Sequence, residues 1–194
     1  MEIGATKAVQ DRLKTTNIEE SKGASLVFCW DTHLTKIQGR NVLFIVNASN
    51  RYTIAMTDIE QGNWNYYTMY ISRVIHGVMQ EMGYSEDQIG QYFKMSGDTT
   101  VTKTHGRKSV GGINRMVMDA QYFGKKLEKE AKYQWELSEY LNRDICQPEG
   151  FDAYGYPSEL FKLDMERLGI AAKRKPAKVI DFAQYIENNR GTND

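Results

Sequence analysis

The chain of 194 residues carries 25 basic and 25 acidic side chains, so its formal net charge of zero excludes an overall field that would attract nucleic acid or an anionic membrane. Its hydrophobic content of 41% suits one domain with a substantial core, and no segment approaches the roughly 20 apolar residues that cross a bilayer. The first residues lack the basic-then-apolar pattern of a signal peptide, so we expect a cytoplasmic protein without membrane contact.

The first 22 residues predict a short strand followed by one helix. Residues 1–5 form the candidate strand, and Thr6 is a suitable N-cap for a helix with Val9 and Leu13 on one side. The polar run from Thr15 to Lys22 ends this helix.

Residues 23–57 predict an antiparallel β-meander. Apolar residues alternate with polar ones between 26 and 37, a turn follows at 38–41, and Val42–Val46 is an apolar run typical of a central strand buried on both faces. A second turn at 47–50 leads to a third strand at 52–56. The predicted fold class is therefore α+β, with an antiparallel β-meander sheet covered by helices.

Two helices are predicted after the meander. Apolar residues recur at helical spacing from Tyr67 to Met82, and Gly83 ends that segment. Ser85 begins a second helix, which we expect to reach Met95.

The remainder predicts an edge strand, a long helix and a C-terminal extension. Residues 99–104 have high β-propensity, and a helical pattern then runs from Ser109 through Leu141. We place a domain boundary after residue 144, which divides the chain into an α+β domain (1–144) and a mostly helical extension (145–194). The extension contains a short helix at 158–168 and a loosely held end, where Val179, Ile180, Phe182, Tyr185 and Ile186 would allow another helical turn or two.

A basic loop at the start of the long helix is the main candidate site. Residues 99–126 carry six basic side chains against the single acid Asp119. Free backbone N–H groups at a helix start, glycines and basic side chains together favour an anion such as phosphate or the nucleic-acid backbone. The P-loop spacing is absent, and a solvated loop with a capped helix is the alternative interpretation. The candidate anion-binding residues are Lys103, His105, Arg107, Lys108, Ser109, Gly111 and Gly112.

Catalytic and metal-binding patterns are absent from the sequence. None of the three histidines has a Cys, His or carboxylate at ligand spacing, so we predict no metal and no cofactor. Asp31 with Asp58 or Glu60 is a candidate carboxylate pair, but these residues stand at predicted strand ends, where charged groups face water. We therefore expect a non-enzymatic binding or regulatory module. The alternative is a small enzyme for a phosphorylated or nucleotide substrate, with His105 as the acid–base group and Lys103 and Arg107 as phosphate holders.

Three further features bear on partners. Cys29 and Cys146 fit two reduced structural thiols. Aromatic residues make up 11% of the chain and would suit stacking on single-stranded nucleic acid, although core packing explains Phe28, Trp30 and Phe44. Residues 134–170 carry eight acidic against three basic side chains, either as a solvated acidic face or as a segment that screens the basic loop. A protein partner or a second copy of the chain, held by the C-terminal extension, is another alternative.

Several short motifs also occur in a fixed order. They are Met1-Glu2-Ile3, Thr6-Lys7, Phe28-x-Trp30, the strand ending at Asn47, Arg51-Tyr52, and Thr102-Lys103-Thr104 followed by Arg107 and Ser109. In these motifs, residues 1–125 resemble an uncharacterised bacterial family catalogued only as a domain of unknown function. The resemblance implies a bacterial, cytoplasmic α+β domain and brings no activity, cofactor or catalytic residue with it.

Overall fold

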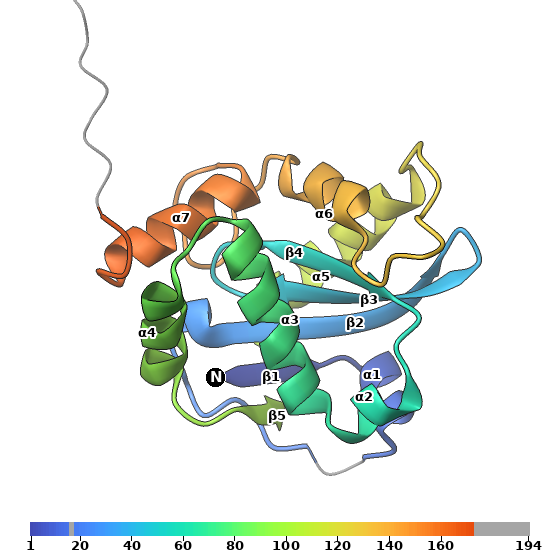
Figure 1. Cartoon of the computed structure of the whole chain (residues 1–194), viewed down its shortest axis with the longest axis horizontal. Coiled ribbons are helices and arrows are strands. Elements are labelled where there is room, and N and C mark those ends of the chain that lie inside the picture. Colours follow the sequence, from blue (N-terminus) through green and yellow to red (C-terminus); the bar gives the residue numbers. More distant parts are fainter. Residues whose placement is uncertain (16–17, 173–194) are drawn as a thin grey trace, which may run out of the picture.

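A single sheet organises the chain in the computed structural model, which describes residues 1–15 and 18–172 (Figure 1). In that part of the chain the sheet has five strands in the order β4-β3-β2-β1-β5. They are β1 (Glu2–Ala5), β2 (Cys29–Ile37), β3 (Arg40–Asn47), β4 (Thr53–Thr57) and β5 (Thr100–Thr102). The predicted α+β class is confirmed, and β5 is the expected edge strand.

The sheet is mixed, so the prediction of a purely antiparallel sheet is wrong. β2, β3 and β4 form the predicted meander, with the two-residue turn Gln38-Gly39 between β2 and β3. β1 instead pairs in parallel with both β2 and β5. Parallel neighbours require crossover connections, and strand propensity in the first five residues carries no information about this distant pairing.

Helices cover both faces of the sheet (Figure 1). The first face is covered by α1 (Lys7–Leu13), α2 (Gln61–Asn65), α3 (Tyr67–Glu81), α4 (Glu86–Ser96) and α7 (Pro157–Arg167). The second face is covered by α5 (Gly106–Gln121) and α6 (Trp135–Asn142). A 3₁₀ turn, Leu26–Phe28, leads directly into β2.

Alternation along β3 explains the two apolar cores. Leu43 and Ile45 pack with α3 on the first face, whereas Val42, Phe44 and Val46 pack with α5 and α6 on the second. β3 is therefore buried on both faces, as predicted for the run Val42–Val46, although β2 is the middle strand of the five. Phe28 and Trp30 are also buried in the first core, which confirms their structural role.

The start of α4 follows a local sequence signal, whereas the bounds of α5 do not. α4 begins with a capping box, in which the Ser85 hydroxyl accepts the Gln88 N–H and the Gln88 side chain accepts the Ser85 N–H. The prediction of one long helix from Ser109 to Leu141 is wrong, because α5 starts at Gly106 and stops at Gln121. The buried side chain of Gln134 donates hydrogen bonds to the carbonyls of Glu128 and Ala131, which holds the loop between α5 and α6 in a non-helical path.

The C-terminal region packs on the main core as far as it is described. The predicted helix at 158–168 is confirmed as α7, whose Phe161 and Met165 lie in the first core, and Asn50 donates a 2.9 Å hydrogen bond to Asp164. The division of the chain at residue 144 stays a prediction. The expected helical turns at 179–186 lie outside the described residues. Among the helices that are described, none is long and apolar enough to cross a membrane.

Candidate functional site

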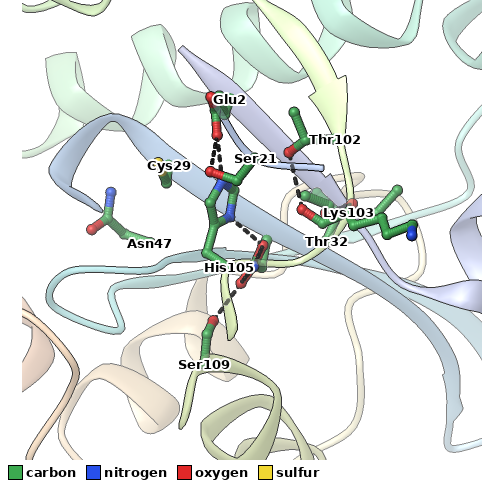
Figure 2. A network of polar contacts seen from close by, with 12 residues as sticks. Glu2, Ser21, Cys29, Thr32, Asn47, Thr102, Lys103, His105 and Ser109 are labelled. Carbon is green, nitrogen blue, oxygen red and sulfur yellow. Dashed lines mark hydrogen bonds and ion pairs between the residues drawn. The ribbon is translucent and has the colours of Figure 1, made fainter. Parts of the chain in front are cut away.

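A buried polar cluster occupies the β1–β2–β5 half of the second face. The two-residue period of a strand places Glu2 and Gly4 of β1 on this face, while Ile3 points into the first core. In the parallel register Glu2 lies beside Cys29 and Gly4 beside Asp31. His105, which follows β5, completes the cluster between them (Figure 2).

His105 joins two carboxylates through its two ring nitrogens. Nδ1 lies 2.7 Å from Oδ1 of Asp31, and Nε2 lies 3.0 Å from Oε2 of Glu2. The His105 side chain is 2% exposed and the Asp31 side chain 0%, so water does not compete for these bonds. Burial alone lowers the pKa of His105, but the hydrogen bonds and charges of Asp31 and Cys29 raise it to about 10. The imidazole is therefore protonated, and it bridges Asp31 and Glu2 through one hydrogen bond at each ring nitrogen.

Glu2 is held from its other side by the segment before β2. Its Oε2 accepts a 2.6 Å hydrogen bond from the Ser21 hydroxyl, and its Oε1 accepts one of 2.9 Å from the Lys22 backbone N–H. Burial raises the pKa of Glu2, but these donors and His105 outweigh it and lower the pKa below its ordinary value. Glu2 thus stays ionised in the cluster.

Asp31 stands at the N-terminus of α5. It accepts the backbone N–H of His105, the N-cap residue, at 3.2 Å, together with His105 Nδ1 and the Ser109 hydroxyl. A carboxylate at this end of a helix is favourable because the helix dipole is positive there. The candidate carboxylate pair of Asp31 with Asp58 or Glu60 is wrong, and so is the alternative that Asp31 faces water. Asp31 lies inside the fold, while Asp58 pairs with Arg40 and Glu60 with Lys132.

Gly4 makes room for this arrangement. A Cβ at Gly4 would lie 1.8 Å from Oδ1 of Asp31 and 3.0 Å from the Cα of Thr104. Only a residue without a side chain lets Asp31 lie across β1 and reach His105.

Three side chains of the cluster are also metal-ligand types. Among the described residues, Glu2, Cys29 and His105 are the one group of three or more Asp, Glu, His or Cys residues with ligand atoms all within 4.8 Å of one another. All three are buried. No metal-ligand spacing is visible in the sequence, because the three positions come from three separate segments of the chain.

A cavity of about 280 Å³ lies directly outside the cluster, between α5 and the loop 144–149. We call it the α5 cavity. Its charged lining side chains are Arg51, Lys108, Arg115, Asp144 and Glu149. Ser109 and Gly112 of α5 and Cys146 complete the part of the wall that is relevant here. The Ser109 hydroxyl therefore links the cavity to Asp31 and, through it, to His105.

Arg51 belongs to the charged wall of the cavity and lies beside two carboxylates. It has a positive φ of 63° in the turn between β3 and β4, where its N–H donates to the Asn47 carbonyl. Its Nη2 is 3.7 Å from both Asp119 and Asp144, which is longer than a hydrogen bond. Oδ2 of Asp119 is buried and has no hydrogen-bond partner in the described part of the chain. The side chain of Arg51 also interacts with the Cys146 thiol, and the donors of its guanidinium that face the two carboxylates make no hydrogen bond to them.

The predicted anion-binding residues fall into separate places. Lys108, Ser109 and Gly112 line the α5 cavity, and His105 lies in the buried cluster. Lys103 pairs with Glu20, while Arg107 and Gly111 are exposed and do not line the cavity. Because α5 begins at Gly106, Gly111 and Gly112 lie inside the helix instead of at its start.

Sequence reasoning did not assign Arg51, Arg115, Glu2 or Cys29 to a site. Arg115 is one of the six basic side chains of residues 99–126, but its position there does not indicate a cavity. Arg51 stands alone between a predicted turn and a predicted strand, so no motif marks it as a binding residue. The segment 134–170 does contribute acids beside the basic side chains, because Asp144 and Glu149 line the same cavity.

A larger cavity of about 540 Å³ lies between α5 and α6 and has the opposite charge. Asp119, Glu136, Glu139 and Asp144 line it, against Lys125 and Arg143. It does not suit the anion that the sequence predicted.

The fold and the cluster define a mixed-sheet α+β protein with a buried Glu–His–Asp bridge beside a basic cavity. A family model described as a domain of unknown function (DUF6933) matches residues 2–160, so the chain belongs to that family. The match extends beyond residue 125, where the resemblance predicted from the sequence ends. No curated protein and no solved structure matches the chain.

Proposed function

We propose that the protein is a binding module that holds a small phosphate-bearing ligand in the α5 cavity. The observation that carries this proposal is the convergence of Arg51, Lys108 and Arg115 on one cavity with a serine hydroxyl in its wall. Guanidinium groups suit phosphate because their planar N–H donors match its oxygens in pairs.

The free donors and the size of the cavity support this ligand class. Arg51 makes no hydrogen bond to its two carboxylate neighbours, and the one oxygen that Lys108 Nζ contacts in the described chain is the Pro148 carbonyl, at 3.2 Å. The lining side chains of the cavity include three bases and the two acids Asp144 and Glu149, and behind them Asp119 lies 3.7 Å from Arg51 and 3.3 Å from Arg115. A volume of about 280 Å³ is near the lower end of ordinary ligand sites, so the ligand is small.

Calorimetric titration at low salt tests the proposal, with inorganic phosphate, a nucleoside monophosphate and a short single-stranded oligonucleotide as probes. Lys108→Ala and Arg115→Ala should each weaken binding about tenfold, since one charge-assisted hydrogen bond contributes roughly 1.5 kcal/mol. Arg107→Ala is the matched control, because Arg107 is an exposed cation of the same helix that does not line the cavity.

The Arg107→Ala control distinguishes binding in the α5 cavity from binding across the basic surface. Equal weakening by Arg107→Ala and Lys108→Ala, with a lower salt slope in both, would mean that nucleic acid binds across the basic surface. Failure of the parent to bind any of the three probes would refute the proposal.

Catalysis on the same ligand is a second candidate, and one observation favours it. Ser109 lines the cavity and donates a hydrogen bond to Asp31, which makes it the candidate nucleophile. Asp31 already accepts hydrogen bonds from His105, which weakens it as a base, and His105 itself does not line the cavity. Binding is therefore the better-supported function. If the parent released phosphate from a nucleoside monophosphate and Ser109→Ala did not, catalysis would become the better-supported function.

The proposal includes a bacterial cytoplasmic setting. Cys29 and Cys146 are free and buried, which suits a reducing compartment, and the family resemblance implies a bacterial source. Self-association through the C-terminal extension stays a prediction. Light scattering on the full chain and on a chain ending at residue 172 tests it, and equal monomeric mass in both would contradict it.

A further inference from the structure

Glu2, Cys29 and His105 bring three different ligand atoms to one buried point. Glu2 and Cys29 are neighbours in the register of β1 and β2, and His105 reaches them from the loop after β5. The carboxylate oxygen, thiol sulfur and imidazole nitrogen lie within 4.8 Å of one another. Carboxylate, thiolate and imidazole are the three ligand types that Zn²⁺ takes in proteins.

The orientation of His105 is a second, independent observation. Its Nδ1 is fixed by Asp31 at 2.7 Å, so Nε2 is the nitrogen that faces Glu2 and Cys29. Histidines that bind metals commonly donate their other ring N–H to a carboxylate in this way, which fixes the tautomer and the ring direction. Gly4 provides the space that lets Asp31 take this place.

Cys29 makes only weak hydrogen bonds in place of a metal bond. Its sulfur is fully buried and lies 3.7 and 3.5 Å from the carbonyl oxygens of Ala24 and Ser25, which are ordinary distances for a thiol donor. A thiol is a weak donor, so little is lost when its proton leaves. In Figure 2 the Cys29 side chain lies beside the His105 ring, with Glu2 above it.

We propose that Glu2, Cys29 and His105 bind one divalent transition-metal ion, Zn²⁺ by the nature of the ligands, with Asp31 as the positioning residue for His105. The ion replaces two protons, one from the Cys29 sulfur and one from His105 Nε2, and both protons pass to solvent. The net charge of the cluster is unchanged by the exchange. One coordination position remains for water.

The required movement is small for the His105–Glu2 pair, and the Cys29 sulfur lies within 4.8 Å of both other ligand atoms. At a metal–ligand distance of about 2.0–2.1 Å, two ligand atoms of a tetrahedral site stand roughly 3.3 Å apart. Nε2 of His105 and Oε2 of Glu2 are already 3.0 Å apart. The bound ion would join β1, β2 and the loop that leads into α5, and so fix the chain beside the α5 cavity.

Cobalt titration of the full chain tests the proposal, because Co²⁺ reports its ligands by colour. The reduced protein is freed of metal with a chelator, the chelator is removed, and Co²⁺ is added. We expect one Co²⁺ per chain, a thiolate-to-cobalt charge-transfer band and the strong visible bands of four-coordinate cobalt, all of which Zn²⁺ removes by displacement. Cys29→Ser should lose the charge-transfer band. Cys146→Ser, the matched control at the other thiol, should keep it.

A measurement on the parent alone covers the case in which a variant fails to fold. Zn²⁺ added in weak buffer at neutral pH should release about two protons per chain. Asp31→Asn should weaken Zn²⁺ binding about 10- to 100-fold. The charge-transfer band should stay in this variant, because the band reports the Cys29 ligand and not the stability of the fold. Absence of the band and of proton release in the parent would overturn the proposal. Retention of the band in Cys29→Ser, or its loss in Cys146→Ser, would do the same.

Discussion

The second face of the sheet is covered in two different ways. Over β3 and β4 it is apolar, and Phe44 and Val46 pack against Ile113 and Met116 of α5. Over β1, β2 and β5 it is polar, and Asp31 is buried together with Glu2, Cys29 and His105. The same helix, α5, begins at the polar half and then covers the apolar half.

The two halves are stable for different reasons. The apolar half depends on buried area and tolerates substitutions that conserve volume. The polar half depends on each charge having its partner, because an unpaired buried charge costs far more than a lost contact. The polar half should therefore be sensitive to pH and to single-atom changes, and the apolar half should not.

Replacement of Asp31 should have the largest effect. Asp31→Asn removes the charge that His105 faces, and loss of one partner of a buried ion pair costs about 3–5 kcal/mol of unfolding free energy. Urea unfolding at pH 7 measures this cost. Asp58→Asn is the control, since the Asp58 side chain is 57% exposed and the change should cost less than about 1 kcal/mol. Equal, small costs for both would contradict the assigned role of the cluster.

The pH dependence of stability should come next in size. The pKa of His105 is about 10 in the folded chain, above its unfolded value of about 6.5. Because its pKa is raised, protonated His105 stabilises the fold fully below about pH 6.5, and this stabilisation is lost as the pH rises through about 10. Between these values the unfolding free energy should fall by at most about 1.4 kcal/mol per pH unit. Unfolding of the parent and of His105→Gln in chelator-containing buffer measures the difference. The same slope in both would exclude His105 as its source.

Gly4→Ala should have an intermediate effect through sterics alone. Its Cβ would overlap Oδ1 of Asp31, so the carboxylate must move off His105, at a cost of about 1–3 kcal/mol. Gly77→Ala is the matched control, because Gly77 lies inside α3 with nothing within 4 Å of a Cβ. That change should instead stabilise the protein by about 0.5–1 kcal/mol. Thermal melts of both variants measure the two effects. Destabilisation by Gly77→Ala but not by Gly4→Ala would contradict the steric role of Gly4.

Ser109→Ala should have the smallest effect in this series. It removes a hydrogen bond to the Asp31 carboxylate, which still has the donors of His105, so we expect a loss of about 1 kcal/mol. Ser72→Ala in α3 is the control, because its hydroxyl donates only to the Thr68 carbonyl four residues earlier. Alanine is the better helix former, so that change should be close to neutral or stabilising.

The sequence by itself determined the local elements. Alternation of apolar residues determined the meander of β2, β3 and β4, and the run Val42–Val46 indicated a strand buried on both faces. Ser85 and Gln88 marked the start of α4 through their mutual hydrogen bonds. These signals are readable because they depend on residues only a few positions apart.

The tertiary structure alone decided the parallel pairing of β1 and the composition of the candidate site. Glu2, Asp31 and His105 are separated by 29 and 74 positions along the sequence, and nothing in one segment specifies the others. The basic loop predicted an anion at the start of α5, and a carboxylate is there, but it is the protein's own Asp31. Burial is the physical reason: a charge that looks solvent-facing in a sequence becomes a structural group once the sheet places its partners around it.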